Sequence, residues 1–291
     1  MLVGTRFVPL SVGLIGLWVI TIGEGLGGEM NSKIQIAKCA IAAFRHCHAL
    51  ANGHGWRRIH HVHIKKTGGT SVNQAIIAAL GQGHESELWY SSLFPYPHVV
   101  VRNNTVFSGW NTDLLWAVRP HFSFAHTPLY ELHRNKSTFM FTVLRDPVRR
   151  AISEFFYHRQ LLPRASDFPE IVDSIMAASD SATVAEWLGY VGPGGNAMIK
   201  MFSRSGDLDE ATDAINSLDC VLLNPLEGDI DLDPLISHFP RLELKSERVR
   251  PSTPSNFTTV LGSIEQVREI LSTDIALWQR VTRAPTILAD E

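Results

Sequence analysis

Apolar positions in the middle of the chain follow a pattern in which a short strand-like run passes through a tight turn into a helix. The first run, Ile59–Ile64, is rich in β-forming residues and leads into a glycine-containing turn at 65–71. Ser71 and Gln74 stand three residues apart, so we expect them to form a capping box at the start of the helix. Apolar residues then recur at helical spacing up to Gly81, at Val72, Ala75, Ile76, Ala79 and Leu80.

A second unit of the same kind begins at Phe139–Leu144, a nearly continuous apolar run that is typical of a central parallel strand. Asp146 follows as a helix cap, with Pro147 at the first helical position. The helix then carries a buried stripe, at Val148, Ala151, Ile152, Phe155 and Phe156. Two such units predict a P-loop-like α/β fold: a single domain with three layers, α/β/α, around a central parallel sheet.

The rest of the chain carries weaker patterns. The region from Gly83 to Arg119 shows no clear periodicity, and we expect an irregular segment that covers a ligand site as a lid. The remaining expected elements are helices at 167–178, 183–190 and 196–202 with a break at 191–195, a strand at 220–223, an acidic connection at 227–233 and a closing helix across 264–281.

The N-terminal segment predicts entry into the secretory pathway. Phe7–Ile22 is uncharged, follows Arg6, and is intermediate in length between a signal-peptide core and a membrane span. We therefore divide the chain into a signal anchor or signal peptide at 1–28, a stem or leader helix at 29–55 and the α/β domain at 56–291. The alternative for the first segment is a buried core helix. Three glycosylation sequons agree with luminal exposure, at Asn103, Asn135 and Asn256.

Charge narrows the class of ligand. The 291-residue chain has a net charge of -3, so no nucleic-acid partner is expected, because phosphate-backbone binders carry a strong basic excess. Residues 1–160 hold 16 Lys and Arg against 8 Asp and Glu, a net +8, whereas residues 161–291 hold 10 against 21, a net -11. An anionic ligand is therefore expected in the first half. The three cysteines are too few for a disulfide framework.

The turn after the first strand has the composition of an anion cradle. It reads Lys66-Thr67-Gly68-Gly69-Thr70-Ser71. Paired glycines let backbone N–H groups converge, the following helix directs its positive end at the same point, and Lys66 adds a full charge. These features suit a phosphate or a phosphosulfate. The lysine precedes the glycines, unlike in a magnesium-dependent P-loop. The alternative is an ordinary tight turn between strand and helix.

The second unit offers a second anion-binding group. Arg145 leaves the end of the strand with a guanidinium fork that matches a phosphate. Ser153 lies two turns into the helix, beside Arg149 at the edge of the apolar stripe, so both can face a ligand. The alternative for Arg145 is a surface position beside the capping Asp146. The two units together favour one site for a ligand with two anionic groups.

These two segments resemble the membrane-bound carbohydrate sulfotransferases, such as the heparan sulfate and glycan O-sulfotransferases. His63–Ser71 is similar to their 5′-phosphosulfate-binding loop, H-x-P-K-T-G-G-T-S, with Lys65 in place of the usual proline, and 141–155 resembles their 3′-phosphate-binding strand and helix. Weaker similarities lie at Asn196–Lys200 and Asp274–Trp278, the second resembling a terminal D-x-x-L-Y. The resemblance covers about 56–284.

The resemblance implies a catalytic domain that transfers a sulfuryl group from 3′-phosphoadenosine 5′-phosphosulfate (PAPS) to a glycan hydroxyl, without a metal. It implies a single-pass type II protein of the Golgi membrane with a luminal catalytic domain, or a secreted one. Lys66–Ser71 would hold the phosphosulfate, with Lys66 neutralising charge on the leaving oxygen, and Arg145 and Ser153 would hold the 3′-phosphate.

The acceptor hydroxyl needs a general base, and we select His126, which ends a Phe-rich run. A structural histidine is the alternative reading of His126, and three further residues remain candidates for the base: His121, His133 and Glu131. Six of the 13 histidines and one cysteine lie within 46–63, but their spacing matches no standard zinc site, so no metal is predicted.

Two other functions remain open at the level of sequence. One is a nucleotide kinase or NTPase with a degenerate loop, which would need magnesium. The other is a non-catalytic glycan-binding domain on the same fold. Neither the acceptor nor the modified hydroxyl follows from the residues.

Overall fold

The computed structural model describes most of the predicted domain, at residues 58–81, 98–102, 105–109, 122–132, 138–224, 230–239, 244 and 260–283. The predicted signal anchor and stem, 1–55, lie outside these ranges, as do the sequon asparagines Asn103, Asn135 and Asn256. Within the described ranges, no helix combines the length and apolar character needed to cross a membrane.

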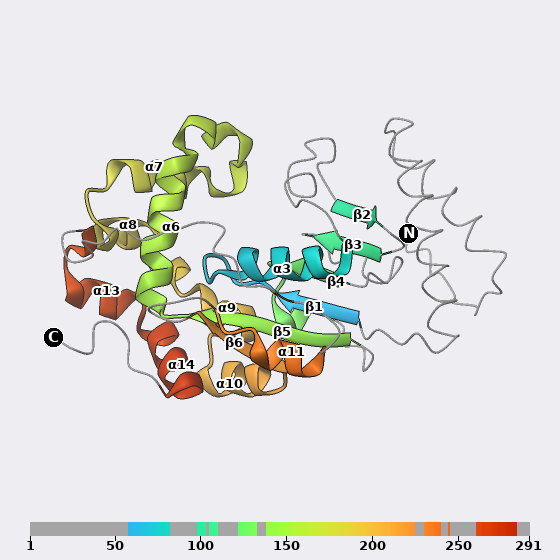
Figure 1. Cartoon of the computed structure of the whole chain (residues 1–291). Helices are drawn as coiled ribbons and strands as arrows, with labels where there is room; N and C mark the ends of the chain where they lie inside the picture. Colours follow the sequence, from blue (N-terminus) through green and yellow to red (C-terminus); the bar gives the residue numbers. More distant parts are fainter. Residues whose placement is uncertain are drawn as a thin grey trace, which may run out of the picture.

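A six-stranded sheet forms the centre of the domain (Figure 1), with the strand order β2-β3-β4-β1-β5-β6. Five neighbouring strands run parallel, and β2 pairs antiparallel with β3 at one edge. The strands are β1 (Arg58–Val62), β2 (His98–Arg102), β3 (Thr105–Gly109), β4 (Phe122–Ala125), β5 (Thr138–Arg145) and β6 (Cys220–Asn224).

The predicted central strand is confirmed. β5 pairs in parallel with β1 on one side and β6 on the other, and every residue after Thr138 is buried. A strand covered on both faces has no solvent-facing positions, which explains why its sequence is continuously apolar rather than alternating.

Helices cover both faces of the sheet. On one face, α3 (Gly69–Gly81) and α11 (Asp233–His238) pack over Ile59, Phe122 and Phe141. On the other face, α9 (Ala197–Phe202), α10 (Leu208–Asn216) and α14 (Ser272–Thr282) pack over Val62 and Met140. Figure 1 shows α3 on one side of the strands and α10 and α14 on the other. The predicted three-layer α/β/α domain is therefore the observed architecture.

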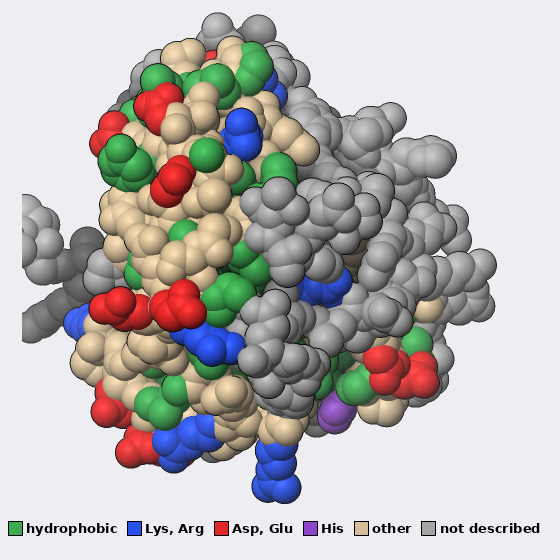
Figure 2. Space-filling model, turned by 90° about the vertical axis from the view of Figure 1, so that its left-hand side faces the viewer, with side chains coloured by type: hydrophobic (Ala, Val, Ile, Leu, Met, Phe, Trp, Pro, Cys, Tyr) green, Lys and Arg blue, Asp and Glu red, His purple; other side chains and the backbone are tan. Residues whose placement is uncertain are grey.

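A third core lies beyond the carboxyl ends of the strands. There α6 (Pro147–Leu161) packs with α7 (Val172–Asp180), α8 (Val184–Val191) and α13 (Ile264–Ile270) around Phe155 and Trp187. Three short 3-10 segments accompany them, at Leu162–Asp167, Pro169–Ile171 and Gly192–Gly195. Figure 2 shows charged side chains of both signs interspersed on the outer face of this part.

Several local predictions need correction. The 83–119 region is not irregular throughout, because β2 and β3 form a hairpin that extends the sheet. Helix α3 begins at Gly69, so Ser71 lies inside its first turn, where its N–H donates to the Gly68 carbonyl, and the predicted capping box is wrong. Helix α10 was not predicted. The closing helix is divided at Leu271 into α13 and α14.

Candidate functional site

The predicted site residues come together because four parallel strands end at the same edge of the sheet. Val62 at the end of β1 pairs with Ala125 of β4, and with Thr142 of β5. His126, the loop that follows β1, and Arg145 therefore leave three adjacent strands side by side. The fourth strand end adds Asn224, which pairs in register with Arg145. Open parallel sheets bind their ligands at this edge.

Side chains from the neighbouring strand ends hold the carbonyl groups of the glycine loop. Arg145 Nη1 donates to the Lys66 carbonyl at 3.1 Å, and Asn224 Nδ2 donates to the Thr67 carbonyl at 2.8 Å. Within the loop, the buried Thr67 hydroxyl donates to the Ile64 carbonyl at 3.0 Å. With these carbonyl groups engaged, the first amides of α3, at Gly69 and Thr70, form the open end of a helix, which favours an anion.

The two glycines of the loop are required for different reasons. Gly68 has a φ of 95°, a left-handed conformation, and a Cβ there would lie 2.5 Å from Asn224 Nδ2. Gly69 has no such torsion, but a Cβ there would lie 2.5 Å from Cδ2 of the buried His63 ring. The absence of a side chain at these two positions lets the loop pack against Asn224 and His63.

Lys66 adopts a backbone conformation that is rare for a residue with a side chain, with a φ of 65°. Its ammonium lies 4.1 Å from the centroid of the Tyr157 ring on α6. A cation–π contact of this kind gives a long flexible side chain a preferred position. Strained backbone of this kind is common where a loop clamps a ligand.

Helix α6 presents three polar or aromatic side chains one turn apart, from Arg149 through Ser153 to Tyr157, on the face that meets Lys66. Its start is set as predicted, since the Asp146 carboxylate accepts from the Arg149 amide at 2.9 Å and Pro147 follows. Ser153 is 3% exposed and Arg145 is 7% exposed, so neither is a surface group. Tyr157 was not identified from the sequence, although its spacing from Ser153 places it on this face.

The predicted base, His126, has a fixed tautomer. Its Nδ1 lies within hydrogen-bond distance of the His63 backbone carbonyl, which only accepts, so Nδ1 carries the proton. Burial lowers the pKa of His126 to about 4, outweighing the opposite effect of that hydrogen bond, while the charge of Lys65 acts in the same direction as burial. At neutral pH the ring is therefore uncharged, with its lone pair on Nε2.

Further buried rings extend from His126 under the loop. His61 stacks on Phe141 with a centroid separation of 4.5 Å and on His63 at 4.8 Å, and its Nδ1 donates to Asn73 Oδ1 at 2.6 Å. Burial lowers the pKa of His61 to about 3 and that of His63 well below its usual value. These histidines are neutral aromatic packing groups, and the described residues contain no group of three or more His, Cys, Asp or Glu that could hold a metal.

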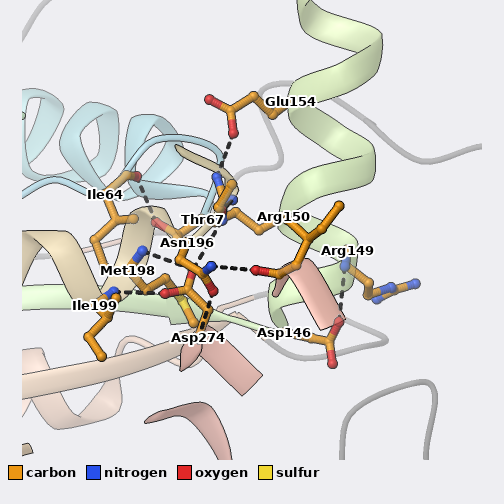
Figure 3. A network of polar contacts seen from close by, with 12 residues as sticks. Ile64, Thr67, Asp146, Arg149, Arg150, Glu154, Asn196, Met198, Ile199 and Asp274 are labelled. Atoms are coloured by element: carbon orange, nitrogen blue, oxygen red, sulfur yellow. Dashed lines mark hydrogen bonds and ion pairs between the residues drawn. The ribbon is translucent and has the colours of Figure 1, made fainter. Parts of the chain in front are cut away.

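A buried polar network supports α6 from behind the site (Figure 3). Arg150 is fully buried; its Nη1 lies 2.5 Å from Glu154 Oε2 and its Nη2 donates to the Gly195 carbonyl. Asp274, also fully buried, accepts from the amides of Met198 and Ile199 at 3.0 and 2.8 Å. The weakly matched motifs around Asn196 and Asp274 meet here, because Asn196 Oδ1 accepts from the Asp274 amide at 3.0 Å.

Of the other residues considered for the base, only Glu131 is described. It is exposed, in the 3-10 turn Leu129–Glu131 that follows His126. His121 and His133 lie outside the described residues. No protein-family model and no curated protein sequence matches this chain.

Proposed function

We propose that the chain is a PAPS-dependent carbohydrate O-sulfotransferase that modifies a glycan hydroxyl by in-line transfer. One observation carries the proposal: three groups meet at three adjacent strand ends. They are the glycine loop with Lys66, the buried Arg145 guanidinium, and a neutral His126 of fixed tautomer. Each of these groups answers a separate requirement of sulfuryl transfer.

The loop fits the 5′-phosphosulfate of the donor. A Cβ at Gly68 or Gly69 would overlap neighbouring side chains, so only glycine fits at these two positions. The first amides of α3, at Gly69 and Thr70, would donate hydrogen bonds to the phosphosulfate. Lys66 would neutralise the negative charge that builds on the phosphate oxygen as the bond to sulfur breaks. A cationic group placed at that oxygen stabilises the transition state more than the bound donor.

Arg145 and Ser153 would hold the 3′-phosphate, which distinguishes this donor from ATP. Arg145 already braces the loop through the Lys66 carbonyl, and its guanidinium has further N–H groups for a phosphate. Ser153 stands on the face of α6 that meets Lys66. Because Arg145 contacts the loop and would also bind the 3′-phosphate, it would fix the 5′-phosphosulfate and the 3′-phosphate of the donor relative to each other.

His126 would act as the general base. Its Nε2 would accept the proton of the acceptor hydroxyl while the acceptor oxygen forms its bond to sulfur and the bond between sulfur and the phosphate oxygen breaks. The products are a sulfate ester and 3′-phosphoadenosine 5′-phosphate (PAP). The low pKa of His126 keeps the base deprotonated at neutral pH.

Location and partners belong to the same proposal. The apolar Phe7–Ile22 segment would anchor the chain in the Golgi membrane or direct its secretion, and the catalytic domain would face the lumen, where glycans are the acceptors. No metal ion and no nucleic acid takes part in the proposed reaction.

The test is transfer of labelled sulfate from PAPS to a panel of polysaccharides and glycoconjugates by the full chain. Lys66→Ala and Arg145→Ala should each lower the rate by roughly 100-fold or more. The control is Arg164→Ala, which removes a cationic side chain that is 64% exposed. Normal rates in both site variants would overturn the assignment of the site.

Calorimetry separates this proposal from a kinase or NTPase. We expect PAP to bind in the presence of EDTA and to bind much more tightly than AMP, which lacks the 3′-phosphate. Arg145→Ala should remove that preference. A ligand preference for ATP with magnesium would favour the kinase, and PAP binding without transfer to any acceptor would favour a non-catalytic domain.

A further inference from the structure

His63 makes contacts on both sides of the candidate site. Its backbone carbonyl accepts from His126 Nδ1 and so sets the tautomer of the proposed base. Its own N–H donates to the Ala125 carbonyl at 2.9 Å, which continues the pairing of β1 with β4 up to the residue before His126. The main chain of His63 therefore contacts both the last residue of β4 and His126, which follows it.

The side chain of His63 lies between the base and the interior of the sheet. Its ring centroid is 4.7 Å from that of His126 and 4.8 Å from that of His61. His61 stacks in turn on Phe141 of β5 with an interplanar angle of 9°. Three of these rings, those of His63, His61 and Phe141, form a stack, and the His126 ring contacts its end at an interplanar angle of 41°. The stack therefore limits how far the His126 ring can move toward the sheet.

The same ring lies directly against the donor loop. A Cβ built at Gly69 would be 2.5 Å from His63 Cδ2 and 2.7 Å from His63 Nε2, so the ring fills the space beneath the first residue of α3. His63 is 3% exposed, and a rearrangement of its ring would therefore have to move the loop, the base, or both.

We propose that His63 is a positioning residue that couples the glycine loop to His126, so that one side chain sets the distance between the anion-binding amides and the base. This inference rests on the proposed function for its catalytic meaning, but the coupling itself is a property of the free protein. A shift of about 1 Å between the base and the donor loop is enough to lower a rate by roughly 100-fold.

The variant that tests the coupling is His63→Ala, which keeps the backbone carbonyl and removes only the ring. His60→Ala is the matched control. His60 is a neutral, buried histidine of β1 on the opposite face of the strand from His61, bonded to the Ser123 hydroxyl at 2.8 Å, and it is absent from the ring stack. Each variant removes one buried histidine ring, from β1 or from the residue that follows it, so the loss of packing is comparable.

Two measurements give the result without turnover. The first is the titration of His126 in the free protein by NMR with ¹⁵N-labelled histidine, its signals assigned through His126→Gln. The second is the affinity for PAP by calorimetry. In His63→Ala we expect the pKa of His126 to rise toward its usual 6.5, because a ring that contacts it is removed and burial is what lowers its pKa. PAP affinity should fall by roughly tenfold, whereas His60→Ala changes neither. Transfer rates should fall further than PAP affinity, since base and donor are both displaced.

The outcomes separate the inference from the proposed function. If the wild type transfers sulfate but His63→Ala keeps both the pKa of His126 and the PAP affinity, the coupling is refuted. If the wild type transfers no sulfate and binds no PAP, while the pKa of His126 still changes only in His63→Ala, the proposed function fails and the positioning of His126 stands. Should His63→Ala not fold, His63→Gln supplies the same comparison with a planar polar group of similar reach.

Discussion

Replacing Asp274 by asparagine should destabilise the domain by about 3 kcal/mol while leaving its shape almost unchanged. Asp274 is a fully buried residue of α14, and its carboxylate contacts the start of α9. Each carboxylate oxygen accepts one hydrogen bond from a backbone N–H there, from Met198 or Ile199. An amide of the same size places an NH₂ group against one of these donors. A lost hydrogen bond to a charged group costs about 1.5–3 kcal/mol, and an unsatisfied buried donor a further 1–3 kcal/mol.

Two further terms act on this estimate. Arg150, fully buried, has its Nε 4.0 Å from Asp274 Oδ2, and breaking a buried ion pair costs about 3–5 kcal/mol in total, a figure that includes the lost hydrogen bonds. In the opposite direction, burial raises the pKa of Asp274, so the charge is costly to bury and its removal returns part of the loss. The remainder, about 3 kcal/mol, is a large share of the stability of a typical domain.

Urea denaturation followed by tryptophan fluorescence measures this loss, because Trp278 is buried on the same helix as Asp274. The midpoint should fall with an unchanged slope. The control is Asp209→Asn. Asp209 is 75% exposed, and its Oδ1 lies 2.5 Å from Arg280 Nη1. Loss of this exposed ion pair should cost less than about 1 kcal/mol. Equal losses in the two variants would refute the view that the buried network holds α9 and α14 together.

Two further predictions concern the loop at Gly69 and the buried histidines of β1. Gly69→Ala should abolish PAP binding, because the added Cβ would meet the rings of His61 and His63; unchanged affinity in calorimetry would contradict the close packing of the loop. Acid should unfold the protein early, since burial lowers the pKa of His60 to about 4 and of His61 to about 3, from the usual 6.5. Their neutral forms stabilise the fold above pH 6.5, and each should lose about 2 kcal/mol of that contribution by pH 5, which urea midpoints at pH 7 and pH 5 would reveal.

The parts of the fold that were predictable carry their signals locally. The apolar run at Phe139–Leu144 and the Asp146-Pro147 pair after it describe a buried strand and a helix start without reference to the rest of the chain, and both were confirmed. The loop at Lys66 was placed for the same reason, between a strand and a helical stripe. Parallel pairing then brings these segments to one edge of the sheet.

The features that were missed depend on partners distant in sequence. Asn224 is an ordinary polar residue at the end of a short strand until β6 pairs with β5 and brings its amide to the Thr67 carbonyl. The β2–β3 hairpin pairs Val100 with Phe107, but its short strands show too little alternation to be recognised. Ser71 was assigned as a cap because its side chain suits one, whereas the turn at Gly68 starts the helix two residues earlier.

Arg149 and Arg150 show why local sequence patterns do not predict which side chains of such a site are buried. They are neighbours on one helix and identical in type, so any local measure treats them alike. Yet Arg149 is half-buried near the proposed ligand, and Arg150 is completely buried. A buried guanidinium is stable only where anions and carbonyl groups meet it, and here these come from Glu154, Gly195 and Asp274. Because two of these three partners lie on other elements, only the assembled fold determines which arginine is available to a ligand.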